Sequence, residues 1–191
     1  MSVTTSYGRL TINQLESIRA SRSGLISFSD GTLPTDQSLY LDKSSPVIAW
    51  LLSPLKRHEQ LYFAALVQAG DLESYSAPDF GPEPPMDHFL LAIEGRGEDK
   101  QKELDLGLGP ACYFSSREVK EFSVLLGSVT RSHLAQQLDF KAMDEAELPL
   151  DYWQEEGQQT FDDYIFPLFQ QLQDFYRQAA ERDQGVLVWN S

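Results

Sequence analysis

The chain has 191 residues, with 29 Asp or Glu against 15 Lys or Arg, so its formal net charge at pH 7 is -14. This excess of negative charge disfavours binding to nucleic acid or to an anionic membrane surface, because both depend on Lys and Arg. The single cysteine, Cys112, excludes an internal disulfide and is typical of a reducing compartment. No apolar run approaches the roughly 20 residues that cross a bilayer, and the N-terminus lacks the pattern of a secretory signal. The sequence therefore predicts a cytoplasmic protein.

Three helix starts are indicated in the first 70 residues. Thr11 and Gln14 have the spacing of a capping box before an apolar face. Further on, Ser45 can cap a mostly buried helix, and Pro46 suits the first helical position. The same pattern recurs directly afterwards, with Ser53 as the cap of a third helix.

The middle of the chain is less regular. Residues 71–85 contain four prolines and one glycine without a sustained period, which predicts an irregular loop. The stretch MDHFLLAIEG then predicts a short apolar helix. The charged stretch RGEDKQKELDLG that follows is expected to be exposed.

The second half predicts alternating strands and helices. ACYF, residues 111–114, indicates a short strand, and Ser115 and Glu118 have capping-box spacing at the start of the next helix. The longest helix pattern begins near Thr160, and Pro167 is compatible with it only in the first turn. Gly185 is expected to end this helix, before a buried VLVW strand.

These elements predict an α+β fold, because a helix that leads directly into a terminal strand indicates a sheet packed under helices. We expect a single compact domain with several helices on a small mixed sheet. Its long C-terminal helix should be followed by a buried end strand. A chain of this length is most simply one domain.

The stretch DLGLGPACYFSSREVKEF, residues 105–122, invites a search for chemistry. A dinucleotide loop needs G-x-G-x-x-G between a strand and a helix, whereas GLGP has two glycines, then a proline, and leads into a strand. We interpret it as a tight turn. Strand alternation places Cys112 and Phe114 on one face and Tyr113 on the other, so we interpret Cys112 as a small buried hydrophobe and not a nucleophile.

Other catalytic or metal-binding patterns are missing from the sequence. The three histidines lie in separate segments without metal-ligand spacing, and the many carboxylates fit helix caps and solvated faces. The sequence therefore assigns no catalytic residue, no cofactor-binding residue and no metal ligand, and it predicts no cofactor.

The charged pair Asp42 and Lys43 precedes a buried helix, and two interpretations remain open. In the first, Asp42 accepts hydrogen bonds from the helix-start N–H groups while Lys43 reaches solvent. In the second, Asp42, Lys43 and Tyr113 form a polar cluster at the floor of a pocket near the loop Gly107–Cys112.

The chain resembles a known family, the YfbM-like bacterial proteins that carry the domain of unknown function DUF1877. Five stretches carry the resemblance in the family's order: YGRLTINQLESI, LYLDKSSPVIAWLLS, DLGLGPACYFSSREVKEFSVLL, FKAMDEAELPLDYW and LQDFYRQAAERDQGVLVWNS. The corresponding family positions are Asp42, Lys43, Trp50, Gly107, Gly109, Pro110, Gly185 and Trp189. The resemblance implies a compact α+β fold over residues 1–191, with an insertion at about 54–84, and supplies no reaction or catalytic residue.

Two functional hypotheses follow. The first is a non-enzymatic binding protein whose acidic surface masks a basic protein partner, such as an immunity protein that neutralises a toxin or effector domain. The alternative is a small-molecule enzyme with a pocket near Asp42, Lys43 and the loop Gly107–Cys112. The oligomeric state is left open.

Overall fold

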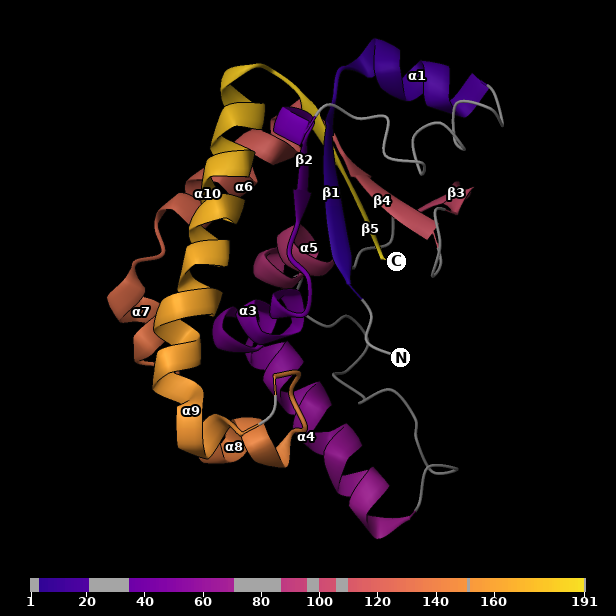
Figure 1. The fold of residues 1–191 in the computed structure, drawn as a ribbon. Coiled ribbons are helices and arrows are strands. Elements are labelled where there is room, and N and C mark those ends of the chain that lie inside the picture. Colours follow the sequence, from indigo (N-terminus) through magenta and orange to yellow (C-terminus); the bar gives the residue numbers. More distant parts are fainter. Residues whose placement is uncertain are drawn as a thin grey trace.

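The centre of the fold is a five-stranded sheet with the strand order β2-β1-β5-β4-β3 (Figure 1). The computed structural model describes residues 4–20, 35–70, 87–95, 100–105, 110–150 and 152–190. The strands are β1 (Thr5–Leu10), β2 (Ser38–Tyr40), β3 (Lys100–Asp105), β4 (Pro110–Phe114) and β5 (Gly185–Asn190). The predicted α+β class is confirmed. The sheet is antiparallel in every described pairing instead of mixed.

Helices cover both faces of this sheet to different extents. One face carries the larger core and packs against four helices: α3 (Ser44–Leu52), α5 (His88–Glu94), α6 (Ser116–Gly127) and α10 (Phe166–Glu181). Helix α1 (Ile12–Ala20) lies on the other face, over the smaller core (Figure 1). Strand side chains alternate between the two cores, as the pleat requires. Tyr7 and Val188 join the large core, whereas Leu10 and Leu187 join the small one. Both cores share one sheet, so the described residues form a single domain.

The predicted long C-terminal helix and buried end strand are confirmed, and β5 occupies the middle of the sheet. The role predicted for Gly185 is wrong, because α10 already ends at Glu181 and Gly185 is the first residue of β5. A Cβ atom at Gly185 would come 2.6 Å from ring atoms of Tyr113 on the neighbouring strand. The glycine therefore permits a close approach within the sheet.

Three of the predicted helix caps are formed, whereas the cap expected at Ser45 is not. Ser53 accepts a hydrogen bond of 2.9 Å from the Lys56 N–H at the start of α4 (Pro54–Ala69), and Thr11–Gln14 and Ser115–Glu118 make reciprocal contacts. Helix α3 instead begins at Ser44, and Ser45 lies inside its first turn. The Ser45 hydroxyl lies 2.7 Å from that of Thr5 on β1, which provides a tertiary partner that local spacing does not reveal.

Helix α4 extends from the base of α3, away from the sheet (Figure 1). Gly70 ends it in the left-handed conformation, with a φ of 69°. The predicted insertion at about 54–84 begins with this helix. The irregular loop expected at residues 71–85 lies outside the described residues, so the insertion stays a prediction.

A long helical run from α9 (Trp153–Thr160) passes through η3 (Phe161–Ile165), a π-helical segment, and continues as α10. Pro167 lies in the first turn of α10, as expected. The helical run itself, however, starts well before this proline, at Trp153. The N–H of Phe166 bonds the carbonyl of Phe161, five residues earlier. The wider turns of a π segment accommodate a proline, which lacks an N–H donor for the regular ladder.

Strands β1, β2 and β3 were not predicted from the sequence. β3 occupies part of the charged stretch that was expected to be simply exposed, and it pairs with β4 at the edge of the sheet. Two short helices, α7 (Arg131–Ala135) and α8 (Phe140–Glu145), complete the helical layer. None of the helices in the described part of the chain has the length and apolar character needed to span a membrane.

Candidate functional site

Asp42, the first residue of the predicted polar cluster, is hydrogen-bonded to Tyr164 of η3. The Tyr164 hydroxyl donates to Asp42 Oδ2 over 2.8 Å. Among the described residues no side chain caps the start of α3, so the interpretation in which Asp42 accepts from the helix-start N–H groups is wrong. Asp42 also has a φ of 48°, in the left-handed region that residues with a Cβ atom seldom adopt.

The other two residues of the predicted cluster lie apart from this contact. Lys43 is exposed at the N-cap of α3, as the first interpretation expected. Tyr113 packs against the small core under α1, on the opposite face of the sheet from the Asp42–Tyr164 contact. The structure therefore does not bring Tyr113 to Asp42. Gly107 and Gly109 lie outside the described residues.

A shallow hollow of about 540 Å³ lies beside Tyr164. We call it the Tyr164 hollow, and its lining residues are Leu150, Glu156, Gln159, Thr160, Asp163 and Tyr164. Glu156, Thr160 and Asp163 follow one another at helical spacing along α9 and η3, so one face of this run forms the wall. The sequence analysis singled out Asp42 but none of these lining residues.

The loop that leads into α9 has an unusual backbone. Leu150 and Tyr152 have φ values of 74° and 71°, which are rare for large side chains. Asp144 stabilises the turn, because its carboxylate accepts from the N–H groups of Trp153 and Gln154 over 2.9 and 3.2 Å. Backbone strain of this kind is often retained where a surface has a function.

Negative charge is concentrated in the segment of the sequence that contains the wall of the hollow. Residues 139–163 contain nine carboxylates and one lysine, a net charge of -8 within a chain whose total is -14. Some of these carboxylates have internal partners. Asp162, for example, accepts from Arg131 and Gln158. The carboxylates of Glu156 and Asp163 have no such partner among the residues that the structure describes, so both are available to an external cation.

Tyr164 is the only tyrosine among the lining residues of the hollow. Burial raises the pKa of Tyr164 to about 12, with further contributions from the hydrogen bond and charge of Asp42 and from Tyr40. Tyr164 therefore keeps its proton at neutral pH, and its hydroxyl donates a hydrogen bond to Asp42. Tyr40 and Tyr152 are 53% and 67% exposed, and the Tyr152 carbonyl accepts from the N–H of Glu156 one helical turn on.

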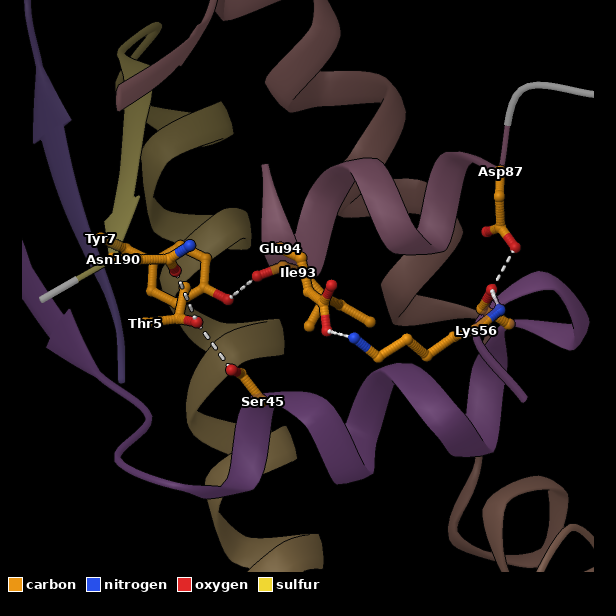
Figure 2. A network of polar contacts seen from close by, with 9 residues as sticks. Thr5, Tyr7, Ser45, Lys56, Asp87, Ile93, Glu94 and Asn190 are labelled. Carbon is orange, nitrogen blue, oxygen red and sulfur yellow. Dashed lines mark hydrogen bonds and ion pairs between the residues drawn. The ribbon is translucent and has the colours of Figure 1, made fainter. Parts of the chain in front are cut away.

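A second group of polar residues is internal, as Figure 2 shows. Lys56 of α4 and Glu94 of α5 form an ion pair of 2.6 Å, and the Tyr7 hydroxyl donates to the carbonyl of Ile93. Burial raises the pKa of Tyr7 well above its usual value, and nearby Tyr176 and Glu94 add to the effect. Because these groups are almost inaccessible, we interpret the network as architectural. The sequence analysis missed it, since its members lie far apart in the chain.

The single cysteine lies in the interior of the protein. Cys112 is 3% exposed in the large core, which confirms its interpretation as a buried hydrophobe. Within the described ranges, no three His, Cys, Asp or Glu side chains are grouped so that they could hold a metal ion.

The fold and this surface define a helix-rich α+β domain with a carboxylate-rich end. A family model described as domain of unknown function DUF1877 matches residues 1–189, so the chain belongs to this family. Its structure is similar to the crystal structure of YfbM from Escherichia coli, a protein of unknown function, with a TM-score of 0.60 and 17% identity. The match covers 98% of this chain and 99% of YfbM, and at this identity it shows a shared fold. A comparison with curated proteins finds no match.

Proposed function

We propose that this chain is a non-enzymatic, cytoplasmic binding protein that masks the basic surface of a protein partner. It would use the acidic surface of residues 139–150 and 152–163, which we call the acidic end. The specific form that we favour is an immunity protein that neutralises a toxin or effector domain. The observation that carries the proposal is the net charge of -8 in residues 139–163, together with the carboxylates of Glu156 and Asp163, which have no partner within the described ranges.

The physical basis is electrostatic complementarity. A surface on which one sign of charge is concentrated attracts an oppositely charged partner and raises the rate of association. Tyrosines are enriched in the cores of protein interfaces, because they contribute contact area and a polar tip. Tyr152, directly before α9, and Tyr40, which influences the pKa of Tyr164, are exposed tyrosines of this kind.

The experiment uses the protein encoded by the gene next to that of this chain. The two proteins are mixed at low and high salt, and the complex is measured by size exclusion and by association kinetics. We expect a complex with a basic partner whose association rate falls steeply with salt. The absence of a complex with the neighbouring product, combined with affinity purification that recovers no basic protein, would count against the proposal.

The alternative is a small-molecule enzyme with a pocket near Asp42, Lys43 and the loop Gly107–Cys112. The Tyr164 hollow supports only the Asp42 part of this pocket, because Tyr164 is hydrogen-bonded to Asp42 whereas Tyr113, next to the loop, lies on the opposite face of the sheet. An Asp42→Asn variant distinguishes the two functions. Loss of a measured turnover with unchanged partner binding would support the enzyme, whereas unchanged turnover would oppose it.

A further inference from the structure

We propose that the Tyr164 hollow is the place where the partner inserts an arginine side chain. The inference rests on the proposed function and deepens it, because it assigns one residue type of the partner to one position on the acidic end.

The hollow has the acceptors that a guanidinium group requires. Glu156 and Asp163 present two carboxylates without a partner among the described residues, and Gln159 and Thr160 add neutral oxygens. A guanidinium is planar, always charged and has five N–H donors, so it can bond several acceptors at once. An ammonium group has three donors at a single point and would satisfy fewer of these groups.

The hollow also has apolar surface for the rest of an arginine side chain. Leu150 provides an aliphatic wall, against which the methylene stem can pack. The ring of Tyr164 lines the same space, and its hydroxyl bond to Asp42 holds the ring in place. A guanidinium over a tyrosine ring gains a cation–π contribution.

The adjacent residues of η3 already bind an arginine of this chain. Arg131 pairs with Asp162, and its guanidinium carbon lies 5.7 Å from the centre of the Phe161 ring. A carboxylate and an aromatic ring that are neighbours on η3 therefore hold a guanidinium. Asp163 and Tyr164 repeat this combination two residues further on, where no internal arginine is bound in the described part of the chain.

Other occupants fit less well. An anion would meet the carboxylates of Glu156 and Asp163 and be repelled. A metal ion would need three or more closely grouped ligands, and the described residues contain no such group of His, Cys, Asp or Glu. The hollow is open and shallow, which suits a side chain presented by a protein better than an enclosed small molecule.

The test uses N-acetyl-arginine amide as the probe and N-acetyl-citrulline amide, its neutral isostere, as the control. Both are titrated into the full chain with isotope-labelled tyrosine rings, and NMR records the ring signals. We expect saturable shifts for Tyr164 with the arginine probe and none with citrulline. The Glu156→Gln/Asp163→Asn variant should bind the probe at least about tenfold more weakly, because charge-assisted hydrogen bonds are lost.

A matched control removes the same charge elsewhere. Glu16 and Glu121 are exposed on α1 and α6, so the Glu16→Gln/Glu121→Gln variant should change the affinity by less than about twofold. Equal weakening in both variants would overturn the inference, since it would show general attraction to negative charge. Equal binding of citrulline, stronger binding of a lysine probe, or shifts that leave Tyr164 unaffected would also overturn it.

The failure of this inference can be separated from the failure of the proposed function. If the neighbouring gene product forms a complex that Glu156→Gln/Asp163→Asn does not weaken, the partner docks elsewhere and only the arginine inference is wrong. If the hollow binds arginine while no basic protein binds the chain, the proposed function is wrong. Urea unfolding of each variant checks that these exposed substitutions leave the fold intact.

Discussion

The ammonium group of Lys56 lies 2.6 Å from the carboxylate of Glu94, and the two side chains are only 5% and 10% exposed. Lys56 belongs to the first turn of α4 and Glu94 to the last turn of α5, so the ion pair joins two helices inside the protein (Figure 2). Replacing Lys56 with Met leaves a buried carboxylate without its cation. We expect a loss of about 3–5 kcal/mol in the free energy of unfolding, measured with urea.

The double variant Lys56→Met/Glu94→Gln is the control for this prediction. It removes both charges, so it should recover a large part of the lost stability, because the cost comes mainly from an uncompensated buried charge. The single variant Glu94→Gln completes the comparison. If the loss in free energy of unfolding of the double variant equals the sum of the losses of the two single variants, the two charges are not coupled and the interpretation is wrong.

Gly157 of α9 provides a second prediction, in which two effects have opposite signs. Ala is favoured over Gly in a helix by about 1 kcal/mol. A Cβ atom at Gly157, however, would lie 2.5 and 2.6 Å from ring carbons of Phe140 on α8. Overpacking of this kind costs about 1–3 kcal/mol, so Gly157→Ala should destabilise the protein on balance.

Gly127 provides the comparison, because a Cβ atom there would have no neighbour within 4 Å. Gly127→Ala should therefore be neutral or stabilise the protein by about 0.5 kcal/mol. Thermal unfolding of both variants tests the pair of expectations. A stabilising Gly157→Ala would show that Phe140 moves aside at little cost.

The local signals of the sequence were reliable where a helix end depends on nearby residues. Ser53 and Ser115 cap their helices as expected, since the donor N–H group lies three residues along the same chain. Ser45 has the same chemistry but uses it toward Thr5, 40 residues earlier. A cap motif therefore predicts what a side chain can do, while the fold selects its partner.

Strand β1 could not be predicted from periodicity, because all six of its residues are buried. Even Arg9 is only 1% exposed, with its guanidinium 5.3 Å from the centre of the Phe175 ring and hydrogen-bonded to Gln178. Both partners belong to α10. From sequence alone, an arginine in a segment without alternation is expected at the surface. The burial of Arg9 follows only from its contacts with α10.

The candidate site was predictable only in part. Asp42 stood out because a charged residue before a buried helix needs a partner. That partner, Tyr164, lies 122 residues later in the chain, and its π-helical segment has no marker beyond the nearby Pro167. Glu156 and Asp163 looked like other carboxylates of an acidic chain until their shared face was seen.

The contact between Tyr164 and Asp42 leads to a prediction about alkaline pH. The pKa of Tyr164 is raised to about 12, above its usual value of 10.0, because the folded protein disfavours the ionised phenolate. The stability that Tyr164 contributes is therefore complete below about pH 10 and is lost as the pH rises toward 12.

The Tyr164→Phe variant removes this titration together with the hydrogen bond to Asp42. At neutral pH it should be less stable than the parent protein by about 1 kcal/mol. That difference should shrink between about pH 10 and 12, because only the parent protein carries the Tyr164 phenolate that folding disfavours. Urea unfolding across this pH range measures the difference.

Tyr152→Phe is the control: Tyr152 is 67% exposed, so its substitution should have a small effect at every pH. A Tyr164→Phe deficit that stays constant up to pH 12 would mean that the hydroxyl of Tyr164 titrates as it would in water, and that Asp42 does not hold it.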